Sequence, residues 1–235
     1  MTPREFVISE SIQAPTGNDG RYEYRVWPRP GHPAIAILNS NWPLVAAERR
    51  SDIYLVHAAS DRILVKLRSG RRLEIKRREG DVGRIQYWTM PFTSEFPLTA
   101  SGRHRLAGAL SLHGDLPRAA SLSPAHLLAA IDARDGRVFP QTVRKSRMLF
   151  RNGGCRAEIC RVAVGGWTGR TVALEAPDLP SIALAIDPLH LGTLANRSYG
   201  DALSRLFAPH LERRGTPLDR PGLLVRTQLQ EKKSQ

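Results

Sequence analysis

The sequence is poor in cysteine and has no long apolar segment. Its 235 residues include two cysteines, Cys155 and Cys160, whose spacing matches no zinc-binding pattern and which cannot build a disulfide framework. No apolar run has the length of a membrane span, and the first residues lack the apolar core of a signal peptide. These absences predict a soluble protein of the reducing cytoplasm that does not enter a membrane.

Common catalytic signatures are missing as well. The sequence has no Gly-x-x-x-x-Gly-Lys phosphate loop and no serine nucleophile elbow. The seven histidines are scattered without the spacing of metal ligands. We therefore assign no role to the histidines, and the sequence identifies no catalytic residue.

Positive charge is what the chain has in excess. The formal net charge is +13 and the isoelectric point is near 10.7. Such an excess points to an anionic partner, which could be nucleic acid, a phosphorylated small molecule, polyphosphate or an acidic membrane surface. Much of the charge is arginine, whose planar fork of donors favours phosphate, but composition does not say which phosphate.

Alternating apolar and polar residues predict many short strands. The clearest case is the hairpin 64–76, in which two alternating arms flank Ser69-Gly70. We expect further strands at 21–27, 51–56, 84–90 (ended by Pro91), 141–150, 155–164 and 170–176, a short helix and turn within 34–47, and helices at 125–134, 182–194 and 198–212. Residues 93–119 receive no assignment.

This pattern predicts an α+β fold built on a mostly antiparallel closed β-barrel with flanking helices, with a sandwich as the second choice. We expect an N-terminal arm at 1–20, a single domain at 21–214 and a C-terminal tail at 215–235.

Charged residues gather on one face of several predicted strands. Alternation places Lys66 and Arg68 on one face of the first hairpin arm, and Glu74 and Lys76 on one face of the second. On an open sheet this face would be solvated. In a closed barrel it would be an interior, where unpaired charges are costly and an anionic ligand would be needed.

The order of these segments resembles the CYTH superfamily, the triphosphate tunnel metalloenzymes. The matching motifs lie within residues 21–212 and are Glu23-Tyr24-Arg25, Asp52-Ile53-Tyr54, Lys66-Leu67-Arg68, Leu73-Glu74-Ile75-Lys76, Lys145-Ser146-Arg147, Glu158, Leu174-Glu175 and Ser198-Tyr199. The resemblance implies a tunnel-like barrel that binds a triphosphate, a polyphosphate or a nucleotide.

The resemblance also implies roles for individual residues. Those expected to bind phosphate are Arg25, Lys66, Arg68, Lys76, Lys145 and Arg147, and those expected to hold Mg²⁺ or Mn²⁺ are Glu23, Glu158 and Glu175. The alternative for the basic residues is a solvated strand face, and the alternative for the three glutamates is internal salt bridging to those arginines and lysines. Asp52 and Tyr54 are expected to be structural.

The chain departs from the family pattern at four positions. Its Glu-x-Glu-x-Lys motif is degenerate, with Arg25 and Trp27 in place of the second Glu and the Lys, and Cys160 and Ala173 stand where further acids often occur. Lost carboxylates weaken a metal site, whereas an added cation strengthens the binding of a polyanion.

Three functions follow. The first is divalent-metal-dependent hydrolysis of a triphosphate, with class IV adenylate cyclase chemistry as a variant. The second is a non-catalytic polyphosphate- or nucleotide-binding protein of the same fold. The third is an RNA-binding protein whose basic surface lies outside the barrel.

Overall fold

The computed structural model describes residues 20–112, 116, 122–132 and 137–213. The strands are β1 (Arg21–Val26), β2 (Leu44–His57), β3 (Ile63–Arg68), β4 (Arg72–Val82), β5 (Ile85–Glu95), β6 (Val138–Asn152), β7 (Cys155–Val164) and β8 (Trp167–Ala176). The helices are α1 (Pro33–Asn41), α2 (Ala100–Ala109), α3 (Pro124–Asp132), α4 (Leu179–Ile186) and α5 (Tyr199–Arg213).

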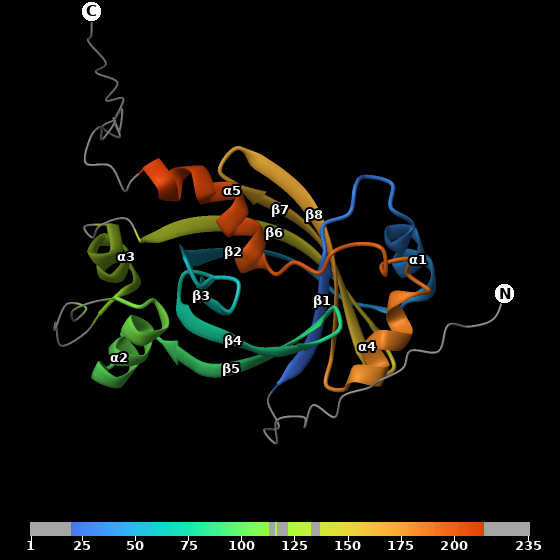
Figure 1. Ribbon diagram of the computed structural model, residues 1–235, viewed down its shortest axis with the longest axis horizontal. Coiled ribbons are helices and arrows are strands. Elements are labelled where there is room, and N and C mark those ends of the chain that lie inside the picture. The colour runs from blue at the N-terminus through green and yellow to red at the C-terminus, as the bar shows by residue number, and fades with distance from the viewer. Residues whose placement is uncertain (1–19, 113–115, 117–121, 133–136, 214–235) are drawn as a thin grey trace, which may run out of the picture.

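The strands form one closed antiparallel barrel. Their order around the barrel is β1-β5-β4-β3-β2-β6-β7-β8, and β8 pairs back with β1. Helices α2 and α3 lie on one side of it, and α1 and α4 on the opposite side (Figure 1). The predicted α+β barrel with flanking helices is confirmed, and the sandwich is excluded.

Tight turns join the strands where the sequence predicts hairpins. Ser69 and Gly70, between β3 and β4, both have positive φ, at 51° and 67°. The paired residues Arg68 and Arg72 are joined by the three loop residues 69–71, and the positive φ values let the chain reverse in this short loop. The chain turns again at Gly153 and at Gly165, also with positive φ.

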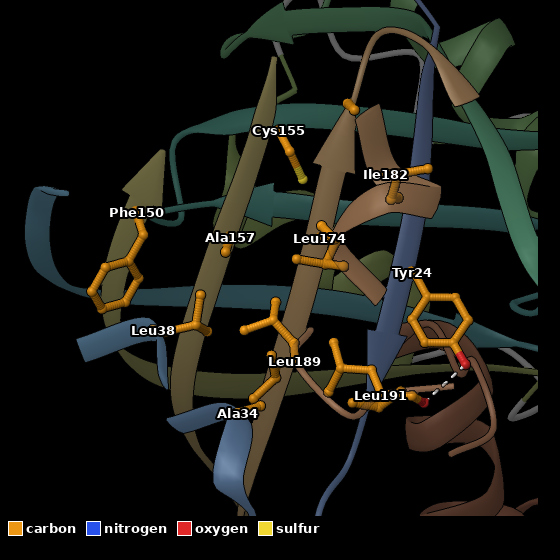
Figure 2. Close-up of a cluster of buried hydrophobic side chains, with 14 of the residues drawn as sticks. Tyr24, Ala34, Leu38, Phe150, Cys155, Ala157, Leu174, Ile182, Leu189 and Leu191 are labelled. Atoms are coloured by element: carbon orange, nitrogen blue, oxygen red, sulfur yellow. Dashed lines mark hydrogen bonds between the residues drawn. The ribbon is translucent and has the colours of Figure 1, made fainter. Parts of the chain in front are cut away.

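On two sides of the barrel, the outward side chains of the strands are apolar and are covered by helices. Leu38 of α1 packs with Ala157 of β7 and Leu174 of β8, and Tyr24 of β1 donates a hydrogen bond from its hydroxyl to the Leu191 carbonyl (Figure 2). On the other side, α2 and α3 cover the outward side chains of β3 and β4. Because these faces are used for packing, the opposite faces must point into the barrel.

Helix α5 closes one end of the barrel. Its Tyr199 and Leu203 are buried against inward side chains at the nearby strand ends, among them Tyr54, Val143 and Val162. This apolar end, which we call the plug, leaves the opposite end of the barrel for polar side chains.

Several predicted boundaries were wrong, including the end of the hairpin, since β4 continues past 76 to Val82. Strand β2 begins at Leu44, before the predicted 51, and α1 occupies only the first part of 34–47. Strand β5 continues past Pro91 to Glu95, because β5 carries an extra residue at this point of its ladder with β4, and the proline therefore interrupts no regular pairing. Helix α2 lies in the unassigned 93–119, and α4 ends at Ile186, before Pro188.

The structure also bears on the two cysteines, on membrane crossing and on the predicted arm and tail. Both cysteines are buried and unpaired. Within the described residues, no helix is long and apolar enough to cross a membrane. The predicted arm and tail fall almost entirely outside the described residues, and the domain limits stay a prediction.

Candidate functional site

Away from the plug, the interior of the barrel is charged. Eight basic side chains pair with five carboxylates there: Arg25, Arg50, Lys66, Arg68, Arg72, Lys76, Lys145 and Arg147 with Glu23, Glu48, Asp52, Glu74 and Glu158. They come from β1, β2, β3, β4, β6 and β7. The expected convergence of cations from separate strands is therefore present, and it is built as a network of ion pairs.

Glu158 of β7 lies at the centre of one group. Its Oε1 accepts a hydrogen bond from Arg25 Nη1 at 2.8 Å, and its other oxygen is bound by Arg147. Burial alone would raise the pKa of Glu158, but Arg25 and Arg147 outweigh it and lower the pKa to about 2. The carboxylate is thus held ionised between two arginines, one of which also donates to Thr171.

Lys145 of β6 marks the boundary with the plug. Its Nζ donates to Asp52 Oδ2 at 3.0 Å and to the Tyr54 hydroxyl at 2.6 Å, and it lies 4.1 Å from the centroid of the Tyr199 ring. Burial, followed by the nearby charge of Lys66, lowers the pKa of Lys145 to about 7 despite Asp52. This lysine can therefore change its charge near neutral pH.

Glu74 of β4 anchors a second group. Lys66 lies 3.0 Å from one carboxylate oxygen, and Arg68 and Arg72 lie 3.3 and 3.0 Å from the other. Burial opposes ionisation, but the basic neighbours, Lys66 first, lower the pKa of Glu74 to about 2. On the same strand, Lys76 is bound to Glu23 of β1.

The charged end opens into a cavity of about 330 Å³. Its walls include all three carboxylates predicted to hold metal, Glu23, Glu158 and Glu175, together with Arg25 and Arg147. This volume is in the range of small-ligand sites. Near this end the side chains of Arg68, Arg72 and Glu175 are 38–40% exposed, so a small anion can reach the network from solvent.

The three carboxylates do not form a ready metal site. Glu23 and Glu175 lie directly opposite each other on β1 and β8, but each is paired with a basic residue, as is Glu158. Among the described residues, no group of three or more His, Cys, Asp or Glu side chains is arranged to hold a metal ion. The residues present do not fit a resident Mg²⁺ or Mn²⁺, because each carboxylate is already paired with an arginine or a lysine and they do not converge as a ligand set.

The structure places the nine predicted site residues in one interior, though not in one cluster. Five line the cavity, whereas Lys66, Arg68 and Lys76 lie around Glu74 and Glu23, and Lys145 lies against the plug. Sequence reasoning missed Glu48 and Arg50 as members of the network. Their alternation with Asp52 could have revealed them, had the strand been extended back toward Leu44.

Comparison with known proteins finds similarity only among solved structures. No protein-family model matches the chain, and no curated protein matches it. A candidate adenylyl cyclase from Hippeastrum, described as having a dominant triphosphatase activity, is 13% identical, with 80% of this chain and 96% of that chain covered and a TM-score of 0.47.

Two other solved structures show the same range of similarity. A conserved hypothetical protein from Pyrococcus furiosus is 16% identical, over 76% of this chain and 97% of its own, with a TM-score of 0.45. An RNA triphosphatase from S. pombe is 10% identical over 83% of this chain and 85% of its own, with a TM-score of 0.31.

Proposed function

We propose that this protein binds a triphosphate or polyphosphate anion at the charged end of its barrel. The observation that carries the proposal is the imbalance of the interior charges, where nine cations face six carboxylates once the Arg21–Glu175 pair at the open end is counted. Enclosed positive charge that is not matched by protein carboxylates is costly unless an anion neutralises it. A chain of linked phosphates supplies several negative charges in a volume that the cavity can hold.

The position of the arginines supports phosphate as the ligand. Arg25 and Arg147 line the cavity and are fixed in place by Glu158 behind them. A guanidinium held at one edge by a carboxylate still presents other N–H donors to a ligand. The site is therefore pre-organised, which reduces the entropy lost on binding.

Hydrolysis of the bound triphosphate is the second candidate function. The observation in its favour is that Glu23 and Glu175 lie opposite each other on β1 and β8, in the same cavity as Glu158. Phosphate oxygens that bind Arg25, Arg147 and Lys76 would compete with these carboxylates and release them. This arrangement is compatible with Mg²⁺ or Mn²⁺ that enters together with the ligand. Two unpaired thiols fit a protein of the cytoplasm.

Binding is tested with tripolyphosphate by calorimetry, in the absence of metal. Arg147→Ala removes a cation from the cavity wall and should weaken binding about tenfold or more, the loss typical of a buried charged hydrogen bond. Arg77→Ala is the matched control, because Arg77 is a 55% exposed residue paired with Glu79. Equal affinity of the parent and Arg147→Ala would overturn the proposal.

Turnover is tested separately, by phosphate release from tripolyphosphate and ATP with and without Mg²⁺ or Mn²⁺. Analysis of the ATP products distinguishes hydrolysis from cyclic AMP formation. Retained binding without any product under all metals would leave a binding protein and reject both enzymatic candidates.

A further inference from the structure

A second basic feature lies outside the barrel. The outward side chains of β2, β6, β7 and β8 line a groove of about 850 Å³ beside the loop that follows β1. Arg49, Arg144, Arg161 and Arg170 contribute to it. None of them belongs to the interior network, since alternation along each strand points them away from it.

Three of these arginines stand in one row across the sheet. Arg49 of β2 lies directly opposite Ser146 of β6, Ser146 opposite Arg161 of β7, and Arg161 opposite Arg170 of β8. Neighbouring strands are about 4.8 Å apart, so the row is roughly 14 Å long. Arg144 lies two residues from Ser146 on the same outward face.

The arginines of the row differ from the interior cations in how they are paired. Within the part of the chain that the structure describes, the side chains of Arg49, Arg161 and Arg170 make no ion pair, in contrast to the cations of the interior. Arg49 and Arg161 are exposed, and Arg170 is half-buried. Adjacent like charges on neighbouring strands repel one another, which an anion lying across them would relieve.

The length and surroundings of the row indicate the kind of anion. A row of this length matches a polymer of phosphates rather than one phosphate group. Arg49, Arg161 and Arg170 also line a second hollow, of about 440 Å³, whose wall includes Ile35 and Met148. Pro28 and Pro30 line the groove of about 850 Å³. Apolar side chains therefore lie on both sides of the arginine row. They can contact the sugars and bases of a nucleic acid, which inorganic polyphosphate does not have.

We propose that this arginine row, together with the groove and the second hollow beside it, binds single-stranded nucleic acid. The arginines contact successive phosphates, and the apolar side chains contact the sugars or bases. The inference is independent of the proposed function, because it concerns the outer face of β2, β6, β7 and β8 and not the interior cavity.

The test uses a fluorescent 15-nucleotide oligouridine with a 5′-hydroxyl end, so that no triphosphate is available to the interior. Arg161→Glu combined with Arg170→Glu should weaken binding about tenfold or more at about 0.1 M salt. It should also reduce the magnitude of the slope of log K against log salt by about 1.4, since each phosphate contact on a single strand contributes about 0.7.

Arg62→Glu combined with Arg71→Glu is the matched control. It makes the same charge change at two exposed positions near β3 and should leave the oligonucleotide affinity within about twofold of the parent. Both double variants should keep the parent's thermal unfolding and tripolyphosphate binding, which shows that the barrel is intact.

Three results would overturn the proposal. The first is unchanged binding by the Arg161/Arg170 variant, and the second is an equal loss in the control, which would reflect overall charge. The third is stronger binding of long-chain polyphosphate or polyglutamate than of oligouridine at equal charge, with the same dependence on Arg161 and Arg170. That result would assign the groove to another class of polyanion.

Discussion

Individual residues in the interior serve both the fold and the proposed ligand site. Glu158 stabilises the barrel by neutralising Arg25 and Arg147, yet the same carboxylate competes with any phosphate for those arginines. Stability and ligand affinity are therefore opposed at this residue.

Glu158→Gln should separate the two effects. The substitution leaves two buried arginines without their common anion, so it should lower the free energy of unfolding by about 3–5 kcal/mol. It should also raise the affinity for tripolyphosphate, because the glutamine oxygen can still accept a hydrogen bond and position the arginines while the competing charge is gone. Urea unfolding and calorimetry measure the two quantities.

Glu175→Gln is the matched control for this prediction. Its carboxylate is 40% exposed and pairs with Arg21 at 3.3 Å, so its loss should cost no more than about 1 kcal/mol. Lower tripolyphosphate affinity in Glu158→Gln than in the parent would show that Glu158 does not compete with phosphate for the two arginines.

Lys145 should give phosphate binding a pH dependence. Burial lowers the pKa of Lys145 to about 7, so its positive charge is present below that pH and is lost above it. Tripolyphosphate affinity should therefore fall as the pH rises through about 7. Lys145→Arg keeps its charge throughout and should show only the titration of the ligand itself. Parallel pH profiles for the two proteins would exclude Lys145 as the titrating group.

At the scale of elements, helix α5 determines which end of the barrel is closed. Tyr199 and Leu203 are buried over the apolar plug, whereas the opposite end of the barrel carries the ion pairs. The apolar face of α5 thereby leaves the barrel with one apolar end and one charged end.

Leu203→Ala tests the contribution of α5. Leu203 is 2% exposed, and truncating a buried leucine costs about 2–5 kcal/mol of stability. Leu184→Ala on α4 is the control, since Leu184 is 77% exposed and its loss should change stability by less than about 0.5 kcal/mol. Comparable denaturation midpoints for the two variants would show that α5 does not stabilise the barrel.

At the scale of the whole molecule, the interior network should make the fold sensitive to acid. The pKa values of Glu74 and Glu158 are lowered from 4.5 to about 2 in the folded protein. Their contribution to stability is complete above about pH 4.5 and is lost as the pH falls toward 2. The free energy of unfolding, measured in urea, should decrease steadily across this window.

The Glu158→Gln variant provides the control for acid sensitivity. It lacks one of the two carboxylates, so its smaller stability at neutral pH should decline less between pH 4.5 and 2. Equal unfolding free energies of the parent at pH 7 and pH 3 would show that these carboxylates do not stabilise the fold.

Local patterns in the sequence determined the strands, the hairpin turns and the face on which charge collects. Alternation at Lys66 and Arg68 predicts an inward pair correctly because side-chain direction in a strand depends only on neighbouring residues. The same holds for the turn at Gly70, where positive φ is a local requirement.

Tertiary structure alone decided which charges meet. Arg25 and Glu158 are 133 positions apart along the chain, and their contact exists because β1, β8 and β7 are neighbours in a closed barrel. Sequence periodicity cannot specify a distance across the barrel, nor that Glu23, Glu158 and Glu175 would each be engaged by a basic residue. Those contacts depend on strand order and register, which are set by the packing of the whole molecule.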